Sequence, residues 1–169
     1  MPILNPDHLF DQADKLIVAP PAGPPRQVDL RRAVSSAYYA LFHLTLTALA
    51  DEVVGALYRN TKRYGLVHRA VDHRTIKDLC LTVSKAKPPI KYVPYVPTKG
   101  FGRDLLVFAS AFVNLQDERH RADYDVTARC RTLDAKVVIA AGRSGMTHFR
   151  GVDGAERKVF LTLLLCPPR

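Results

Sequence analysis

The sequence predicts an all-α fold, most simply an up-down bundle of four or five helices. Apolar residues recur at helical spacing along most of the chain, and no segment shows the alternation that is typical of a half-buried strand. Prolines gather in two stretches that separate helical segments. With 169 residues, the chain is long enough for one domain with a real core. We expect a single domain over 1–169, with an N-terminal helix over 5–18, a core over about 29–147 and a C-terminal helix over about 155–165.

The first half of the chain predicts two helices joined by a proline-rich turn. Asn5 can cap the first helix, and the proline after it suits the first helical position. Four prolines within 19–25 end this helix. A long second helix is predicted from Asp29, as its N-cap, to about Gly55. Its apolar stripe at helical spacing consists of Ala33, Ala37, Leu41 and Leu44.

The second half predicts three further helical regions before the C-terminal helix. The first covers about 65–84 and has a candidate break near Asp72. Residues 85–100 contain four prolines and predict an extended loop, with two short strands as the alternative. Further helices are predicted over about 101–118 and 132–146. Three glycines are expected to weaken the end of the last of these: Gly142, Gly145 and Gly151.

The composition favours a polyanionic partner. The formal net charge is +9 and the pI is near 9.7, which suits RNA or DNA, although it also serves solubility alone. The three cysteines lie far apart and predict free thiols in a reducing cytoplasm. No signal peptide is evident, and the longest apolar run, 159–166, is too short to span a bilayer. We therefore expect a cytoplasmic protein without a membrane partner.

A polar row lies beside the apolar stripe of the long helix. Its members recur at i, i+4, i+7 and i+11 and so share one face: Arg32, Ser36, Tyr39 and His43. We interpret this row as the substrate-binding side of a polar pocket. The alternative is structural, with Tyr38 and Tyr39 as core aromatics whose hydroxyls are tethered and Arg32 as a surface ion pair.

A second polar cluster lies downstream, at the end of the helix predicted over about 101–118. The catalytic candidates are Arg119, His120, Asp123 and Tyr124, and Arg121 is a further substrate-binding candidate. On a helix, His120 would neighbour both Asp123 and Tyr124. Metal-independent RNA cleavage needs a base, an acid and a cation for the phosphate, and this set offers them. The alternative is a clasp of Arg119, Asp123 and Tyr124 that holds the helix end against the long helix.

The segments "RRAVSSAYYALFH" and "LQDERHRADYD" together resemble the HEPN superfamily of small helical domains. The resemblance implies a homodimer and an RNA-directed role, such as a metal-independent endoribonuclease or toxin component in defence, with a nucleotidyltransferase-type antitoxin as partner. HEPN nucleases carry an Arg followed, after four to six residues, by a His. Here Arg119 is followed at that spacing by Tyr124, which favours the alternative of a non-catalytic module that binds a nucleotide or a partner protein.

No cofactor or metal is expected. The chain has no glycine-rich phosphate loop, and His68 and His73 are five residues apart rather than the three or four of a helical metal site. Two other Arg-x4-His spacings, Arg63 to His68 and Arg143 to His148, are interpreted as chance. The basic segment 85–103 contains tyrosines and is either a contact for single-stranded RNA or a solvated loop.

Overall fold

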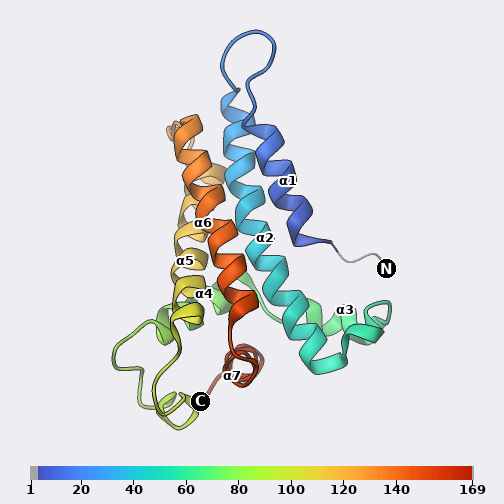
Figure 1. Cartoon of the computed structure of the whole chain (residues 1–169), viewed down its shortest axis with the longest axis vertical. Coiled ribbons are helices and arrows are strands. Elements are labelled where there is room, and N and C mark those ends of the chain that lie inside the picture. The colour runs from blue at the N-terminus through green and yellow to red at the C-terminus, as the bar shows by residue number, and fades with distance from the viewer. Residues whose placement is uncertain (1–3, 169) are drawn as a thin grey trace.

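The computed structural model describes residues 4–168, and these residues form helices, two short 3-10 turns and loops, without a β-strand (Figure 1). The predicted all-α class is therefore confirmed. The α-helices are α1 (Pro6–Leu16), α2 (Gln27–Val54), α3 (Lys62–His68), α4 (His73–Val83), α5 (Arg103–Tyr124), α6 (Thr132–Gly151) and α7 (Gly154–Leu165). The 3-10 turns are Ala56–Tyr58 and Val93–Tyr95.

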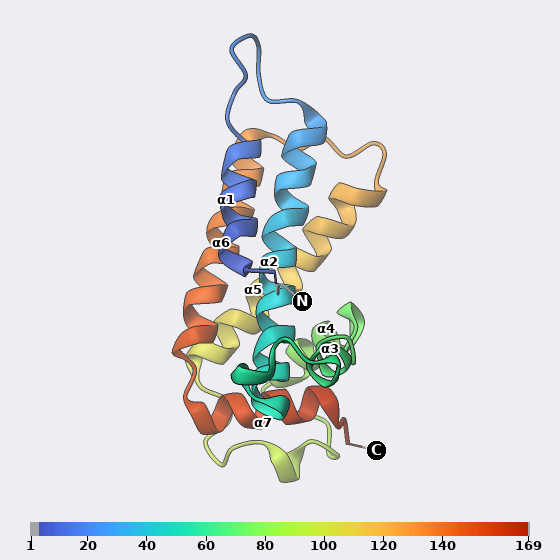
Figure 2. The same cartoon turned by 90° about the vertical axis from the view of Figure 1, so that its right-hand side faces the viewer.

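Four of the helices run alongside one another and alternate in direction. In Figure 1, α1 and α5 run upward while α2 and α6 run downward, and α2 packs against each of the other three. The helices α3, α4 and α7 pack at the lower end, where α7 lies across the bundle axis (Figure 2). The helical region predicted over 65–84 consists of two helices, because Asp72 caps α4 by accepting a hydrogen bond of 2.8 Å from the Thr75 N–H.

Most helix ends lie close to their predicted places. Asn5 caps α1 as expected, since its Oδ1 accepts from the Asp7 N–H at 3.0 Å. Asp29 does not cap α2: the helix begins at Gln27, and Asp29 forms an ion pair of 2.7 Å with Arg26. The helix α5 continues to Tyr124, so the downstream polar cluster lies within it.

The glycines of α6 do not weaken its end, which corrects the sequence-based expectation. The helix continues through Gly142 and Gly145 to Gly151. A Cβ on Gly142 would lie 2.8 Å from Phe10 Cε1, and one on Gly145 would lie 2.8 Å from the Cβ of Ala111. These glycines therefore let α6 approach α1 and α5 more closely than a larger residue would allow.

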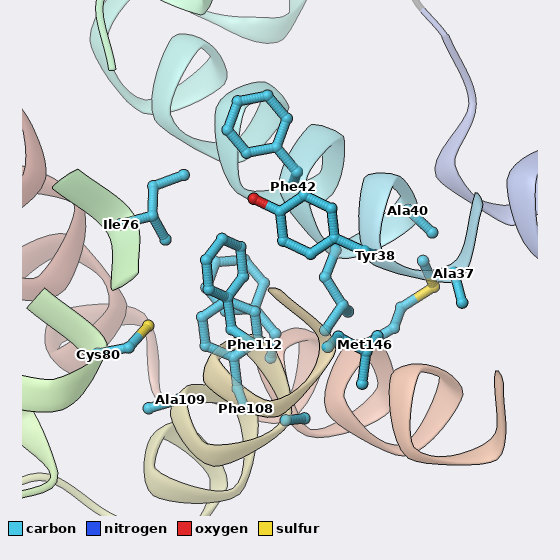
Figure 3. Packing of buried hydrophobic residues seen from close by; sticks show 14 of the residues in the cluster. Ala37, Tyr38, Ala40, Phe42, Ile76, Cys80, Phe108, Ala109, Phe112 and Met146 are labelled. Atoms are coloured by element: carbon cyan, nitrogen blue, oxygen red, sulfur yellow. The ribbon is translucent and has the colours of Figure 1, made fainter. Parts of the chain in front are cut away.

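The core is built around α2 and its contacts with α4, α5 and α6. Tyr38 is fully buried and meets Phe112 edge-on, with ring centroids 5.5 Å apart. Figure 3 shows Ile76 and Cys80 of α4 on one side of these rings. The apolar residues of α7 are also buried inside the chain: Phe160, Leu161, Leu163 and Leu164. They need no second copy to cover them, so α7 gives no independent support to the homodimer that the resemblance implies.

The central helix α2 is long and apolar enough to cross a membrane, judged by length and composition alone. Of its most apolar 18-residue window, 72% is buried inside the protein. A core helix of a soluble protein meets the same criterion, so this helix does not establish a membrane protein.

Candidate functional site

The predicted downstream residues gather with Tyr39 of α2 into one group, which we call the Arg119 cluster: Tyr39, Arg119, His120, Asp123 and Tyr124. A terminal N–H of Arg119 donates to the Tyr39 hydroxyl at 3.1 Å. The guanidinium also lies 5.6 Å from the Tyr39 ring centre and 5.3 Å from that of Tyr124. Two aromatic rings therefore contact this cation, an arrangement in which the negative ring faces stabilise the positive charge.

Asp123 completes the enclosure of Arg119. Its Oδ2 lies 2.7 Å from Arg119 Nε in an ion pair, although that N–H does not point at the oxygen and makes no hydrogen bond. The Ser35 hydroxyl donates to Oδ1 of the same carboxylate at 2.5 Å. Burial disfavours the charge of Arg119, but Tyr39, Asp123 and Tyr124 outweigh it and keep the pKa above its ordinary value. Only 17% of the Arg119 side chain is exposed.

His120 stands outside this enclosure. Its side chain is exposed, and its ring centre lies 4.8 Å from that of Tyr124, which is itself 61% exposed. The Tyr124 ring is therefore a neighbour of both the imidazole of His120 and the guanidinium of Arg119. The imidazole forms no hydrogen bond with residues 4–168, so it is open to solvent and to a ligand.

Of the polar row predicted on α2, the structure brings only Tyr39 to Arg119. Arg32 is exposed and forms neither a hydrogen bond nor an ion pair within the described chain. Ser36 donates to the side-chain oxygen of Gln12 at 3.2 Å and so faces α1. His43 lies beside Tyr39, with ring centres 6.2 Å apart. Arg121, the other predicted binding residue, is exposed and pairs with Glu118 at 3.9 Å.

A neighbouring row on α2, consisting of Arg31, Ser35 and Tyr38, forms further hydrogen bonds with α4 and with α5 and its C-terminal end. The sequence analysis did not identify this row. Arg31 donates to the backbone oxygens of Ala122 and Asp125, each at 2.5 Å. Ser35 bonds Asp123, as described above, and the Tyr38 hydroxyl lies 2.7 Å from Nδ1 of His73. These residues share the i, i+4, i+7 spacing of the predicted row, so spacing alone gave no reason to prefer one row over the other.

Three histidines lie close together beyond Tyr39. The rings of His43 and His68 are nearly parallel, with centres 5.9 Å apart, and His73 stacks on Phe42 at 3.9 Å. Burial lowers the pKa of all three, and the nearby histidines lower that of His43 further. These imidazoles are therefore predominantly neutral at neutral pH. No group of three or more His, Cys, Asp or Glu side chains in residues 4–168 is placed to hold a metal ion.

Two cavities lie away from the Arg119 cluster. One, of about 570 Å³, is mainly apolar and lies between the end of α4, the loop before α5 and Leu163 of α7. The other, of about 480 Å³, lies between α2 and the segment that leads into α3. Its lining includes His43 and His68, so the histidine group borders a cavity.

Comparison of the chain with known protein families, with curated proteins and with solved structures finds no match.

Proposed function

We propose that this protein binds single-stranded RNA through one end of the bundle. The observation that carries the proposal is a group of exposed cations, which we call the cationic end: Lys62, Arg63, Arg69, Lys85, Lys87, Lys91, Lys99 and Arg103. They belong to α3, to the residue that follows it and to the segment from the end of α4 to the start of α5, in the lower half of the molecule in both views (Figures 1 and 2). None of them forms an ion pair with the described residues.

No carboxylate among the described residues forms an ion pair with these eight cations, although Glu156 of α7 accepts a hydrogen bond from the Gly102 N–H beside Arg103. The segment 79–103 contains no Asp or Glu. Three acidic residues near this end already engage other groups: Asp51 and Asp78 form ion pairs with Arg59 and Arg74, and Asp104 forms a hydrogen bond with His148. The positive charge is therefore free to attract phosphates, and each phosphate contact releases counterions, which favours binding.

Exposed tyrosines accompany these cations. Tyr58 is 51% exposed and lies beneath the guanidinium of Arg63, at 5.7 Å from ring centre to Cζ. Tyr95 is 53% exposed in the loop before α5. Stacking of bases on aromatic side chains beside a basic groove is the usual way in which proteins bind single strands. This combination favours a single strand over a duplex.

Binding is favoured over cleavage because Arg119 is already occupied. Its guanidinium contacts Asp123, Tyr39 and the ring of Tyr124. A phosphate would have to displace Asp123 to form a bidentate contact there. This geometry supports the interpretation of Arg119 as a clasp between α5 and α2.

Metal-independent cleavage is the second candidate, and the exposed imidazole of His120 favours it. Tyr124 neighbours both His120 and Arg119, and its exposed ring offers a surface on which an RNA base can stack. His120 would then act as base or acid, since imidazole titrates near neutral pH. The homodimer and the nucleotidyltransferase-type antitoxin partner remain predictions from the resemblance to HEPN proteins.

The test measures binding of a fluorescent single-stranded RNA by anisotropy between about 50 mM and 200 mM salt. We expect affinity to fall with salt, with a log–log slope of roughly 0.7 for each phosphate contacted. The double variant Lys85→Ala/Lys87→Ala should reduce both affinity and slope. The matched control Lys15→Ala/Lys136→Ala removes the same charge from unpaired, exposed lysines of α1 and α6. It should change neither the affinity nor the slope. Affinity that is flat with salt, or equal losses in both double variants, would contradict the proposal.

The same RNA, incubated with a chelator, tests the second candidate. Cleavage by the wild type that His120→Ala abolishes, with the circular-dichroism spectrum unchanged, would favour catalysis. Intact RNA with every substrate tried would leave binding as the function.

A further inference from the structure

The cavity between α2 and the segment that leads into α3, which we call the α2–α3 pocket, has the features of an anion site. Its volume of about 480 Å³ falls within the roughly 300–1,000 Å³ of small-molecule sites. Its charged lining consists of Arg59, Lys62 and Arg69, together with the imidazoles of His43 and His68. No Asp or Glu lines it.

Two of the three cations are free to meet a ligand. Lys62 and Arg69 are exposed, and their side chains form no ion pair or hydrogen bond within residues 4–168. Arg59 is fixed by two hydrogen bonds to Asp51, at 2.9 and 2.5 Å. The Tyr64 hydroxyl donates to the same carboxylate at 2.9 Å, so Asp51 holds part of the pocket wall in place. The pocket therefore keeps an uncompensated positive charge on a preorganised wall.

The histidines add hydrogen-bonding groups to that charge. Nδ1 of His43 is buried and has no hydrogen-bond partner among the described residues. Nε2 of His68 reaches only the hydroxyl of Thr47, at the long distance of 3.5 Å. Buried polar atoms in proteins are nearly always paired, so this unpaired nitrogen, on a residue that lines the pocket, calls for an explanation.

We propose that the α2–α3 pocket binds a phosphate monoester, either of a free mononucleotide or of the end of an RNA strand. A phosphate monoester carries a charge between −1 and −2 at neutral pH and offers three acceptor oxygens. Lys62 and Arg69 would supply the charge, and a protonated His43 or His68 would donate a further hydrogen bond. This site shares Lys62 and Arg69 with the cationic end, but it binds a terminal phosphate inside a pocket and does not require contact with internal phosphates.

The histidines also provide the readout. Besides burial, the pKa of His43 is lowered by His68 and His73, and that of His68 by Arg69 against the opposing charge of Asp51. A bound dianion stabilises the imidazolium form, so it should raise both pKa values. An anion that binds elsewhere on the surface would leave the pKa values of His43 and His68 unchanged.

The first experiment titrates the full-length protein with adenosine 5′-monophosphate, inorganic phosphate and adenosine, and follows the histidine ring protons by NMR as a function of pH. We expect the monophosphate to raise the pKa of His43 and His68, and adenosine to have no effect. Inorganic phosphate should act in the same direction at higher concentration. Assignments come from His43→Gln and His68→Gln. The absence of a shift at millimolar monophosphate would overturn the proposal.

The second experiment tests the cations. Lys62→Ala/Arg69→Ala should weaken binding of the monophosphate by about tenfold or more. Lys15→Ala/Lys136→Ala, which removes the same net charge elsewhere, should leave it unchanged; equal loss in both would overturn a specific site. Both changes replace exposed side chains, and circular dichroism checks the fold.

The third experiment identifies the source of the phosphate and separates this proposal from RNA binding. It compares one oligoribonucleotide with a 5′-phosphate and with a 5′-hydroxyl. Tighter binding of the phosphorylated strand, lost in Lys62→Ala/Arg69→Ala, supports a strand end. Equal binding of the two strands, with the monophosphate still shifting His43 and His68, supports a free nucleotide. Equal binding without any shift would overturn the pocket while leaving RNA binding by the cationic end intact.

Discussion

At the residue scale, Arg119 could serve either of two roles that the sequence alone does not distinguish. Its position beside a histidine and a tyrosine is typical of a phosphate-binding residue, but an arginine there can also hold α5 against α2. The contacts favour the second role, because Asp123 and Tyr39 already engage the guanidinium. The sequence could indicate Tyr39 as a member of a polar pocket, but not which other residues of α2 would face α5. It could not show that the guanidinium would be enclosed, since this depends on Ser35 holding the carboxylate of Asp123.

The buried histidines predict how stability depends on pH. Their pKa values in the folded protein lie below the ordinary value of 6.5. Below about pH 6.5 the unfolded chain therefore binds more protons than the folded one. The contribution of these histidines to the free energy of unfolding is fully present above that pH. It should be lost as the pH falls toward their pKa values in the folded protein. Urea midpoints at neutral pH and about one unit below 6.5 measure the loss. His43→Gln should show a smaller difference between the two midpoints; an unchanged difference would exclude His43 as a contributor.

Two adjacent arginines of α2 give a second prediction at this scale. Arg31 donates to the carbonyls of Ala122 and Asp125 at the end of α5, where a cation also complements the helix dipole. Arg31→Ala should therefore lower the free energy of unfolding by about 1–2 kcal/mol. Arg32→Ala is the matched control, because Arg32 is exposed and unpaired within the described chain, and its effect should stay within about 0.5 kcal/mol. Chemical denaturation of the two variants measures both values, and similar losses would contradict this role of Arg31.

At the scale of elements, the position of α2 explains which predictions succeeded. The helix was predictable because its apolar residues recur over many turns and Gly55, at φ +97°, ends it. Which of its polar rows faces α5 was not predictable. Because α1, α5 and α6 surround α2, buried residues occur on nearly every side of it. Apolar periodicity then marks no single face, and only the packing distinguishes Ser35 from Ser36.

The close approach of α6 to α5 predicts the effect of a single methyl group. Gly145→Ala would place a Cβ 2.8 Å from that of Ala111. Overpacking of this kind costs about 1–3 kcal/mol, against a gain in helix propensity of about 1 kcal/mol. We expect a net loss of about 1–2 kcal/mol in the free energy of unfolding. Gly65→Ala in α3 meets nothing within 4 Å and should stabilise by up to about 1 kcal/mol. Thermal or urea unfolding compares them; stabilisation by both changes would show that α6 can shift to accept the methyl.

At the scale of the whole molecule, the all-helical class and most helix ends followed from local signals such as Asn5 and the proline-rich turn over 19–25. The net charge could also be predicted from the sequence. The distribution of that charge over the surface could not, because it depends on which cations form ion pairs with carboxylates after folding. Arg74 has Asp78 one turn away, whereas Lys85 has no acidic neighbour. The α2–α3 pocket was also hidden, because His43 and His68 come from different helices and meet only through packing.

Because Cys80 is buried, the rate at which its thiol is modified reports how often the core opens locally. Its thiol lies in the core beside Ile76, and burial raises its pKa far above the ordinary value, so almost no thiolate forms in the closed state. Cys166 is exposed at the end of α7 and remains accessible to reagents. Modification of Cys80 must therefore wait until α4 separates from the bundle. The delay between modification of Cys166 and modification of Cys80 therefore measures the rate at which the core opens, and no label has to be added to the protein.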